Sequence, residues 1–212
     1  MFRLVYLLGF IGFVAVVVWA MRSQLIQWAD AKQRLLNHSR DLSDNLRRWR
    51  SLSSPARLGT LMRFFYLATL LSVFILALTG FLPVIVFGQS ISNVAMFLHL
   101  LLAPLFAIGL TALALFWAQR HRFDKKDWDR LRQGVGEENA RSQPAVPNVL
   151  QKIGFWLILL LAVPVIVSTI LMMSSLYGTA GQESLLHLHG YLGLWLLAVV
   201  GVHTYLVLAN KG

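Results

Sequence analysis

The chain has 212 residues, of which 57% are hydrophobic, and it contains no cysteine. The hydrophobic fraction is higher than in ordinary soluble domains and predicts an integral membrane protein. The absence of cysteine excludes disulfides, thiolate-held clusters, cysteine-ligated haem and covalent haem attachment within this chain.

Charge is distributed unevenly, with 17 of the 19 Lys and Arg residues in two stretches, Arg22 to Arg63 and Arg120 to Lys152. Cytoplasmic loops of membrane proteins are enriched in these residues, so we expect the amino terminus outside and the carboxyl terminus in the cytoplasm. The net charge of +10 therefore indicates topology and contact with membrane lipid. Nucleic-acid binding is disfavoured, because basic and aromatic residues do not interleave in a recognisable binding module.

Five segments are apolar over a length sufficient to cross a bilayer as a helix. Their period is helical rather than the alternation of an outer-membrane barrel, which predicts an all-α integral membrane protein with five transmembrane helices. The predicted spans are Leu4 to Met21, Phe64 to Phe87, Val94 to Ala118, Ile153 to Tyr177 and Leu185 to Leu208.

The first 62 residues are expected to form two parts. Residues 1–21 are interpreted as a retained transmembrane anchor, because no cleavage motif of small residues follows and the flank is strongly basic. Residues 22–62 are predicted to form a cytoplasmic arm, with an amphipathic helix from Ser23 to Ser54 whose apolar residues recur every seven positions. Two interpretations of this arm remain open: a helix on the lipid surface, or a docking element for a partner subunit.

Residues 63–212 contain the last four spans and are predicted to form a four-helix membrane domain, interrupted by a flexible cytoplasmic linker at 133–148 that carries Gly and Pro. Arg63 stands at the cytoplasmic boundary of this domain. Its side chain is expected to snorkel to headgroups or to pair with an acidic group of a cofactor. His38 in the arm and His121 among charged residues are interpreted as solvated, not as ligands.

Histidines within the spans are the strongest functional signal, because ionisable groups at membrane depth are costly and normally have a partner. His99 lies about six residues, and His189 about five residues, inside its helix from the same outer surface, so their imidazoles lie at matching depth. Haem ligation by two histidines from facing helices would satisfy both. For each histidine considered alone, the alternative is a hydrogen bond to Ser, Thr or a backbone carbonyl.

His187 points to the opposite face of its helix and is expected to contact the membrane interface, a partner or a quinone. Because helix ends fray and rotate, His187 rather than His189 remains an alternative ligand of the iron.

The last span carries a second histidine on the face of His189. His203 lies 14 residues further on, within roughly 40° of that face and about 21 Å along the axis. Gly190, Gly193 and Gly201 lie beside or between these two histidines, where a flat bulky group could approach the backbone.

These residues resemble the di-haem cytochrome b subunits of membrane-bound formate dehydrogenases and nickel-iron hydrogenases, in the bacterial cytochrome b561-like group. The resemblance covers the last four spans, about 150 residues, and is carried by His99 and by the His189 and His203 spacing. It implies an outer haem b held by His99 and His189, and an inner haem held by His203 with a histidine early in the first core helix. Where the family has R-x-x-H, residues 63–66 read RFFY, so Tyr66 occupies the inner ligand position. With a haem present, the acidic group that Arg63 pairs with at the cytoplasmic boundary could be a haem propionate.

One haem near the outer surface is therefore expected, and three interpretations of His203 remain open. It could bind a second haem, with Tyr66 as an unusual partner or with no sixth ligand. It could hydrogen-bond a quinone together with Tyr66, or it could be a core histidine satisfied by neighbouring polar groups.

The predicted function is that of a b-type cytochrome subunit in the bacterial inner membrane. It would pass electrons between the quinone pool and an iron–sulfur or multihaem cytochrome partner at the outer, periplasmic face. No catalytic acid, nucleophile or phosphate loop is visible, so substrate turnover is expected in other subunits. The alternative is a haem-free anchor or assembly subunit of a respiratory complex. A proton or metal transporter is disfavoured, because no span contains Asp or Glu.

Overall fold

The structure is a computed structural model that describes residues 4, 7–9, 11–12, 15, 28–88, 91–133, 149–174 and 176–209. All regular structure in these residues is helical. Four helices are long and apolar enough to cross a membrane, which confirms the all-α membrane class and four of the five predicted spans. The predicted anchor at 1–21 and the predicted linker at 133–148 lie mostly outside the described residues, so both stay predictions.

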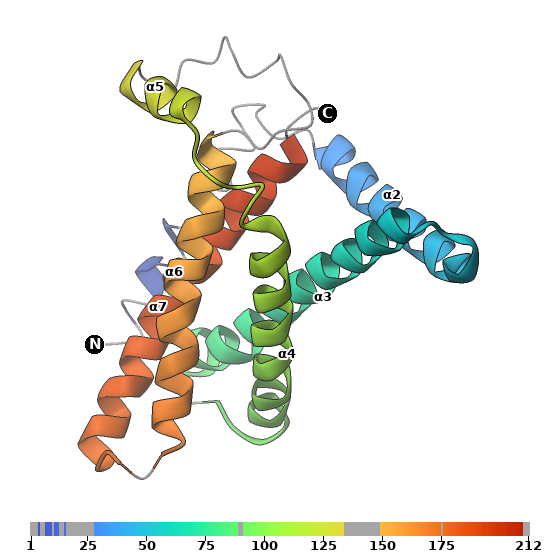
Figure 1. The fold of residues 1–212 in the computed structure, drawn as a ribbon. Coiled ribbons are helices and arrows are strands. Elements are labelled where there is room, and N and C mark those ends of the chain that lie inside the picture. Colours follow the sequence, from blue (N-terminus) through green and yellow to red (C-terminus); the bar gives the residue numbers. More distant parts are fainter. Residues whose placement is uncertain are drawn as a thin grey trace.

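The four spanning helices form two antiparallel pairs that lie side by side (Figure 1). One pair packs α3 along α4, and the other packs α6 along α7. Their bounds are α3 Ser54–Leu82, α4 Asn93–Trp117, α6 Val149–Met172 and α7 Thr179–Ala209. Two peripheral helices, α2 (Trp28–Arg47) and α5 (Lys125–Gln133), lie at the end of the bundle where α6 begins and α7 ends.

The arm is described only from Trp28 onward, and its helix α2 ends at Arg47 instead of continuing to Ser54. A short 3₁₀ turn follows at Trp49–Ser51, in which the Ser51 hydroxyl donates to the Arg48 carbonyl oxygen at 2.9 Å. Such local side-chain bonds compete with helix continuation. The chain then starts a new helix, so the arm turns back toward the membrane earlier than the pattern indicates.

The first span of the four-helix domain is longer than predicted, because α3 begins at Ser54 rather than at Phe64. Proline is favoured in the first turn of a helix, where its missing N–H would have no partner, and Pro55 occupies that turn. At the other end Pro83 opens a π-helical turn, Pro83–Phe87, since proline cannot donate the hydrogen bond that would continue the α-helix. Gly88 ends this turn at a φ of 66°, a left-handed conformation that favours glycine.

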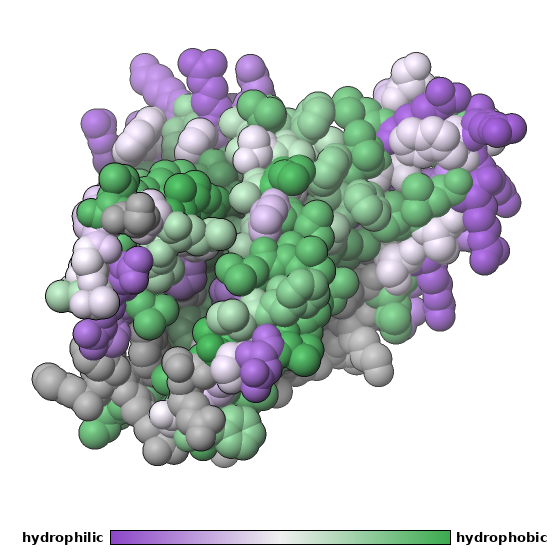
Figure 2. All heavy atoms as spheres, turned by 90° about the horizontal axis from the view of Figure 1, so that it is seen from below, coloured by the Kyte–Doolittle hydropathy of each residue, from purple (hydrophilic) through white to green (hydrophobic). Residues whose placement is uncertain are grey.

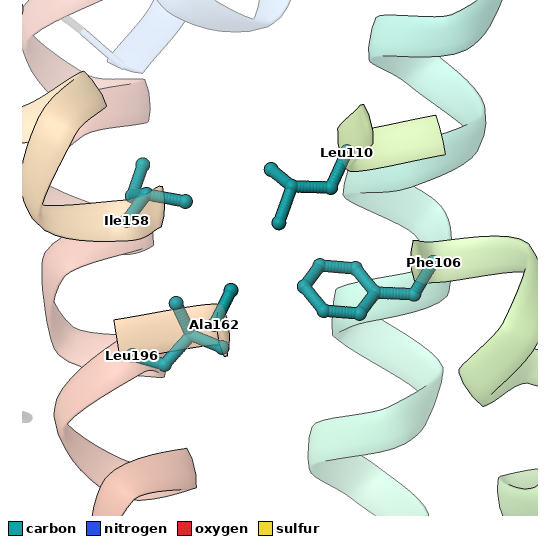
Figure 3. Packing of buried hydrophobic residues seen from close by; sticks show 5 residues of the cluster. All are labelled: Phe106, Leu110, Ile158, Ala162 and Leu196. Atoms are coloured by element: carbon teal, nitrogen blue, oxygen red, sulfur yellow. The ribbon is translucent and has the colours of Figure 1, made fainter. Parts of the chain in front are cut away.

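An apolar cluster joins the two helix pairs near the middle of the bundle (Figure 3). Phe106 and Leu110 of α4 point across to Ile158 and Ala162 of α6 and to Leu196 of α7, and all five are buried. In the sequence, Phe106 and Leu110 lie between His99 and His121, and Leu196 lies between His189 and His203.

Large apolar side chains remain exposed along all four spanning helices. Figure 2 shows apolar residues over most of one face of the molecule, with hydrophilic residues gathered toward its margins. Helices satisfy their own backbone hydrogen bonds, so such surfaces are stable against lipid hydrocarbon.

Candidate functional site

The structure brings His99 of α4 and His189 of α7 together. Their ring centroids lie 6.2 Å apart, with the ring planes inclined by 66°. Two imidazoles bound to opposite sides of one metal have centroids about 6 Å apart, because each metal–nitrogen bond is about 2 Å long and the ring centre lies about 1 Å further. This pair of histidines offers two nitrogen ligands. The four nitrogens of a porphyrin would complete the octahedral coordination of an iron ion.

Hydrogen bonds define which nitrogen of His189 carries the proton. Its Nδ1 lies 3.2 Å from the Val165 carbonyl oxygen, 3.1 Å from the Ser168 hydroxyl and 3.2 Å from the Thr169 hydroxyl. Both hydroxyls donate to the same carbonyl, at 2.8 and 3.1 Å, and a carbonyl only accepts. Nδ1 is therefore the donor, and the lone pair on Nε2 is available to a metal.

The same reasoning applies to His99. Its Nδ1 lies 3.0 Å from the hydroxyl of Thr79 on α3, and that hydroxyl donates to the Ile75 carbonyl oxygen at 2.8 Å. The hydroxyl thus accepts from Nδ1–H, which again leaves Nε2 unprotonated. Metal-binding histidines usually donate their other ring N–H to such an outer partner. Both histidines of this pair thus have the tautomer that ligation through Nε2 requires.

Glycines leave room beside this pair. A Cβ on Gly80 would lie 3.2 Å from Cε1 of His99, closer than most real Cβ contacts, and a Cβ on Gly193 would lie 3.6 Å from the Phe81 ring. The first of these glycines therefore permits the observed position of the imidazole. The donor set and this close approach fit a haem b between His99 and His189.

His187 does not join the pair. Its Nε2 lies 3.6 Å from a carboxylate oxygen of Glu183, one turn earlier on α7, and its side chain is partly exposed. The structure thus places His187 away from the His99–His189 pair, and the choice of His189 as the ligand stays a prediction.

Arg63 lies at the junction of α3 with the arm. Its guanidinium nitrogen Nη1 is 3.6 Å from a carboxylate oxygen of Asp41 on α2, and both side chains are considerably exposed. In this structure the acidic neighbour of Arg63 thus belongs to the arm.

A second cluster of polar and aromatic side chains lies at the other end of the bundle. His203 of α7 is buried beside the main chain of Gln151, and within the described residues its Nδ1 makes no hydrogen bond of standard geometry. The hydroxyl of Tyr66 on α3 is also buried, and its geometry with the nearby Thr204 side chain does not make a hydrogen bond. Buried polar atoms without partners are rare in folded proteins and indicate a missing ligand or water.

His121 belongs to this cluster, contrary to the expectation that it is solvated. It lies in the turn after α4, is only 6% exposed, and stacks on Phe155 of α6 with ring centroids 4.3 Å apart. Its ring centroid is 6.5 Å from that of His203. Arg120 and Arg122 flank His121 in the sequence. The backbone forms a turn at residues 118–121 in place of a helix, and this turn directs the His121 ring inward.

The environment of His121 favours a neutral imidazole. Burial lowers its pKa below the ordinary value, and the charges of Arg120 and Lys152 act in the same direction, whereas the hydrogen bond to the Trp117 carbonyl oxygen opposes them. That bond, at 2.9 Å, is donated by Nδ1–H, so Nε2 again keeps its lone pair.

One sequence signal could have revealed this residue. His99 and His121 are 22 positions apart, which places them within roughly 40° on an ideal helix. His189 and His203 have the same angular relation. The helix α4 ends at Trp117, however, so the helical spacing does not reach His121 and its charged flanks indicated solvent.

An ion pair fixes the segment that carries His121. The Lys152 ammonium of α6 contacts the Asp127 carboxylate of α5 at 2.5 Å, and both side chains are about 95% buried. Trp156 of α6 adds a hydrogen bond from Nε1 to the His121 carbonyl oxygen at 3.0 Å. These contacts hold α5 and the preceding turn against α6.

A spanning helical bundle with histidines paired across its interior defines the class of membrane-embedded b-type cytochromes. A sequence model of the family described as prokaryotic cytochrome b561 matches residues 57–211. The chain belongs to this family, which confirms the resemblance inferred from its histidines and assigns it to electron transport with b-type haem in a bacterial membrane. Neither a curated protein nor a solved structure matches the chain significantly.

Proposed function

We propose that this chain is the membrane subunit that carries electrons between the quinone pool and a redox partner at the outer, periplasmic face. His99 and His189 would hold its haem b through their imidazole nitrogens. The observation that carries the proposal is the approach of these two imidazoles to 6.2 Å, each with Nδ1–H donated elsewhere. The bound haem supplies one-electron chemistry.

The chain's own residues orient the ligands and tune the site. Val165, Ser168 and Thr169 hold the His189 ring through Nδ1, and Thr79 holds the His99 ring. Donation of Nδ1–H to an oxygen raises the basicity of Nε2 and thereby strengthens its bond to a metal. The apolar surroundings limit access of water to the site.

The outer orientation of this pair is supported by the charge distribution. Basic residues gather at the ends of the helices that carry His121 and His203, and the positive-inside rule assigns those ends to the cytoplasm. The amino terminus is then outside and the carboxyl terminus inside. A partner with iron–sulfur or multihaem centres would dock over the short connections at the opposite ends, near His99 and His189.

The test is a reduced-minus-oxidised visible spectrum of the purified chain, compared with His99→Ala, His189→Ala and His187→Ala. We expect b-type absorption in the unmodified protein, loss of one haem per chain in either ligand variant, and no loss in His187→Ala. Absence of b-type absorption would reject the proposal in favour of a haem-free anchor subunit. Retention of all haem in both ligand variants would reject the ligand assignment.

A further inference from the structure

We propose that the corner between α2 and α3 binds the phosphate groups of anionic phospholipids, in the leaflet that the positive-inside rule assigns to the cytoplasm. This arm corner comprises residues 45–62, which are the end of α2, the 3₁₀ turn Trp49–Ser51 and the first turns of α3. Most of these residues precede the range 57–211 that the family model matches, and the inference does not depend on the haem proposal. It favours the lipid surface among the two interpretations of the arm.

The arm corner carries a concentrated positive charge. Its sequence contains no acidic residue and four basic ones, all of them arginine: Arg47, Arg48, Arg50 and Arg57. Two acids precede it on α2, and one of these, Asp41, already lies 3.6 Å from Arg63. A guanidinium group presents a planar fork of N–H donors that can bind two oxygens of one phosphate, whereas an ammonium group acts as a point charge. The choice of arginine at all four positions therefore favours phosphate as the ligand.

Three of these arginines border a recess in the turn. The recess has a volume of about 470 Å³ and is lined by residues 46–51, which include the exposed Arg47, Arg48 and Arg50. The Ser51 hydroxyl donates to the Arg48 carbonyl oxygen at 2.9 Å, and Nη2 of Arg57 donates to the Arg50 carbonyl oxygen at 3.0 Å. Hydrogen bonds thus hold the turn that carries the three guanidinium groups.

Arg57 contributes a donor that lacks an acceptor. Its Nε is buried and, within the described residues, has no hydrogen-bond partner. Buried polar atoms without partners are rare in folded proteins and indicate a missing ligand or water. Because Nη2 of the same side chain is bonded to the Arg50 carbonyl, Nε lies beside the turn that forms the recess. A phosphate oxygen bound at the arm corner would supply an acceptor at this position.

The length of α3 places the arm corner at the membrane surface. The helix has 29 residues and is therefore about 43 Å long, whereas the hydrocarbon core of a bilayer is about 30 Å thick. A helix of excess length is accommodated by tilting. Figure 1 shows α3 running obliquely to the α6–α7 pair, with the arm corner projecting away from that pair. The first turns of α3 are thus expected among the lipid headgroups.

Exposed apolar side chains accompany the arginines. Leu46 and Trp49 are exposed in the arm corner, and Leu58, Leu61 and Phe64 are exposed along the start of α3. Figure 2 shows hydrophilic residues at this projecting end next to the apolar surface that continues toward the bundle. Arginine beside tryptophan and leucine is typical of segments that lie in the membrane interface. An acidic protein surface would pair with the arginines but would not cover the apolar start of a spanning helix.

The experiment measures which lipids surround the arm corner in the full chain. The chain has no cysteine, and the Ser53 side chain makes no capping hydrogen bond to α3, so Ser53→Cys introduces a single thiol for a fluorophore without removing a cap. The labelled chain is placed in nanodiscs with equal amounts of phosphatidylglycerol and phosphatidylcholine, and a quenching nitroxide is attached to one lipid or the other. The ratio of quenching by the two lipids measures the enrichment of the anionic lipid.

We expect phosphatidylglycerol to be enriched around the label. The triple variant Arg47→Gln, Arg48→Gln and Arg50→Gln should lower this enrichment at least about fivefold, the effect of one basic residue near an anionic surface. Replacing the same three residues by lysine should retain more of the enrichment than glutamine does and less than arginine does, because lysine keeps the charge but cannot bind phosphate bidentately.

The matched control removes the same charge elsewhere on this side of the bundle. Arg122, Lys125 and Lys126 are exposed in and before α5, and their combined replacement by glutamine should leave the enrichment at Ser53→Cys unchanged. Helical circular dichroism confirms that both triple variants are folded.

Three results would overturn the inference. The first is equal quenching by the two lipids in the unmodified arm corner, and the second is an equal loss of enrichment in the two glutamine variants. The third is a label that neither lipid quenches, which would indicate an arm lifted from the membrane, as docking on a partner subunit requires. Loss of the enrichment on addition of inorganic phosphate at constant ionic strength would reject the assignment to lipid in favour of free phosphate.

Discussion

The buried ion pair between Lys152 and Asp127 offers the sharpest test of how the inner end of the bundle is held. Their side chains are 4% and 5% exposed, so each charge is almost fully removed from water. Replacing one member of such a pair leaves the other charge without compensation and costs about 3–5 kcal/mol. Lys152→Met is therefore expected to lower the free energy of unfolding substantially.

The structure places the expected loss at the lower end of that range. After the substitution, Asp127 Oδ2 still accepts a hydrogen bond from the main-chain N–H of Asp124 at 2.9 Å. We expect a loss of about 3 kcal/mol, or about 100-fold in the unfolding equilibrium.

The assay is unfolding of the purified chain in mixed detergent micelles, followed by helical circular dichroism. The double variant of Lys152→Met with Asp127→Asn should recover much of the loss, because the isolated charge is gone. Lys126→Met on the exposed face of α5 is the matched control and should stay within about 0.5 kcal/mol of the unmodified chain. A loss below about 1 kcal/mol in Lys152→Met would refute the argument that this pair is desolvated.

Two other substitutions test the outer site and the helix packing. Thr79→Val removes the acceptor of His99 Nδ1–H and should weaken haem binding about 10- to 100-fold, measured by transfer of haem to an acceptor protein. Gly109→Ala would bring a Cβ within 2.2 Å of the Thr69 hydroxyl at the crossing of α3 and α4, and should lower the free energy of unfolding by about 1–3 kcal/mol.

Each of these two substitutions, Thr79→Val and Gly109→Ala, has a matched control variant within the chain. Thr111 is exposed and its hydroxyl donates to the Ala107 carbonyl oxygen of its own helix, so Thr111→Val should leave haem binding unchanged. A Cβ on Gly59 would meet nothing within 4 Å, so Gly59→Ala should be neutral or stabilising by up to about 1 kcal/mol. Equal effects of Thr79→Val and Thr111→Val, or of the two glycine variants, would contradict the contacts described.

Much of the fold follows from the sequence because bilayer crossing depends on local properties. A run of apolar residues of sufficient length must form a helix in lipid, so the last four spans and the all-α class could be predicted without coordinates. The matching depth of His99 and His189 also follows from sequence position alone, since rise per residue and alternating direction determine depth. Their role as ligands remains a proposal.

Tertiary structure decided what depends on how segments turn and pack. His121 has charged neighbours that indicate solvent, yet the turn after α4 directs its ring onto Phe155 and toward His203. Arg63, whose contact with a cofactor stays a proposal, lies beside Asp41, because α2 ends at Arg47 and the chain reverses before α3. Local periodicity determines which residues share a helix face, but the direction of a turn and the neighbour across a bundle depend on contacts between distant parts of the chain.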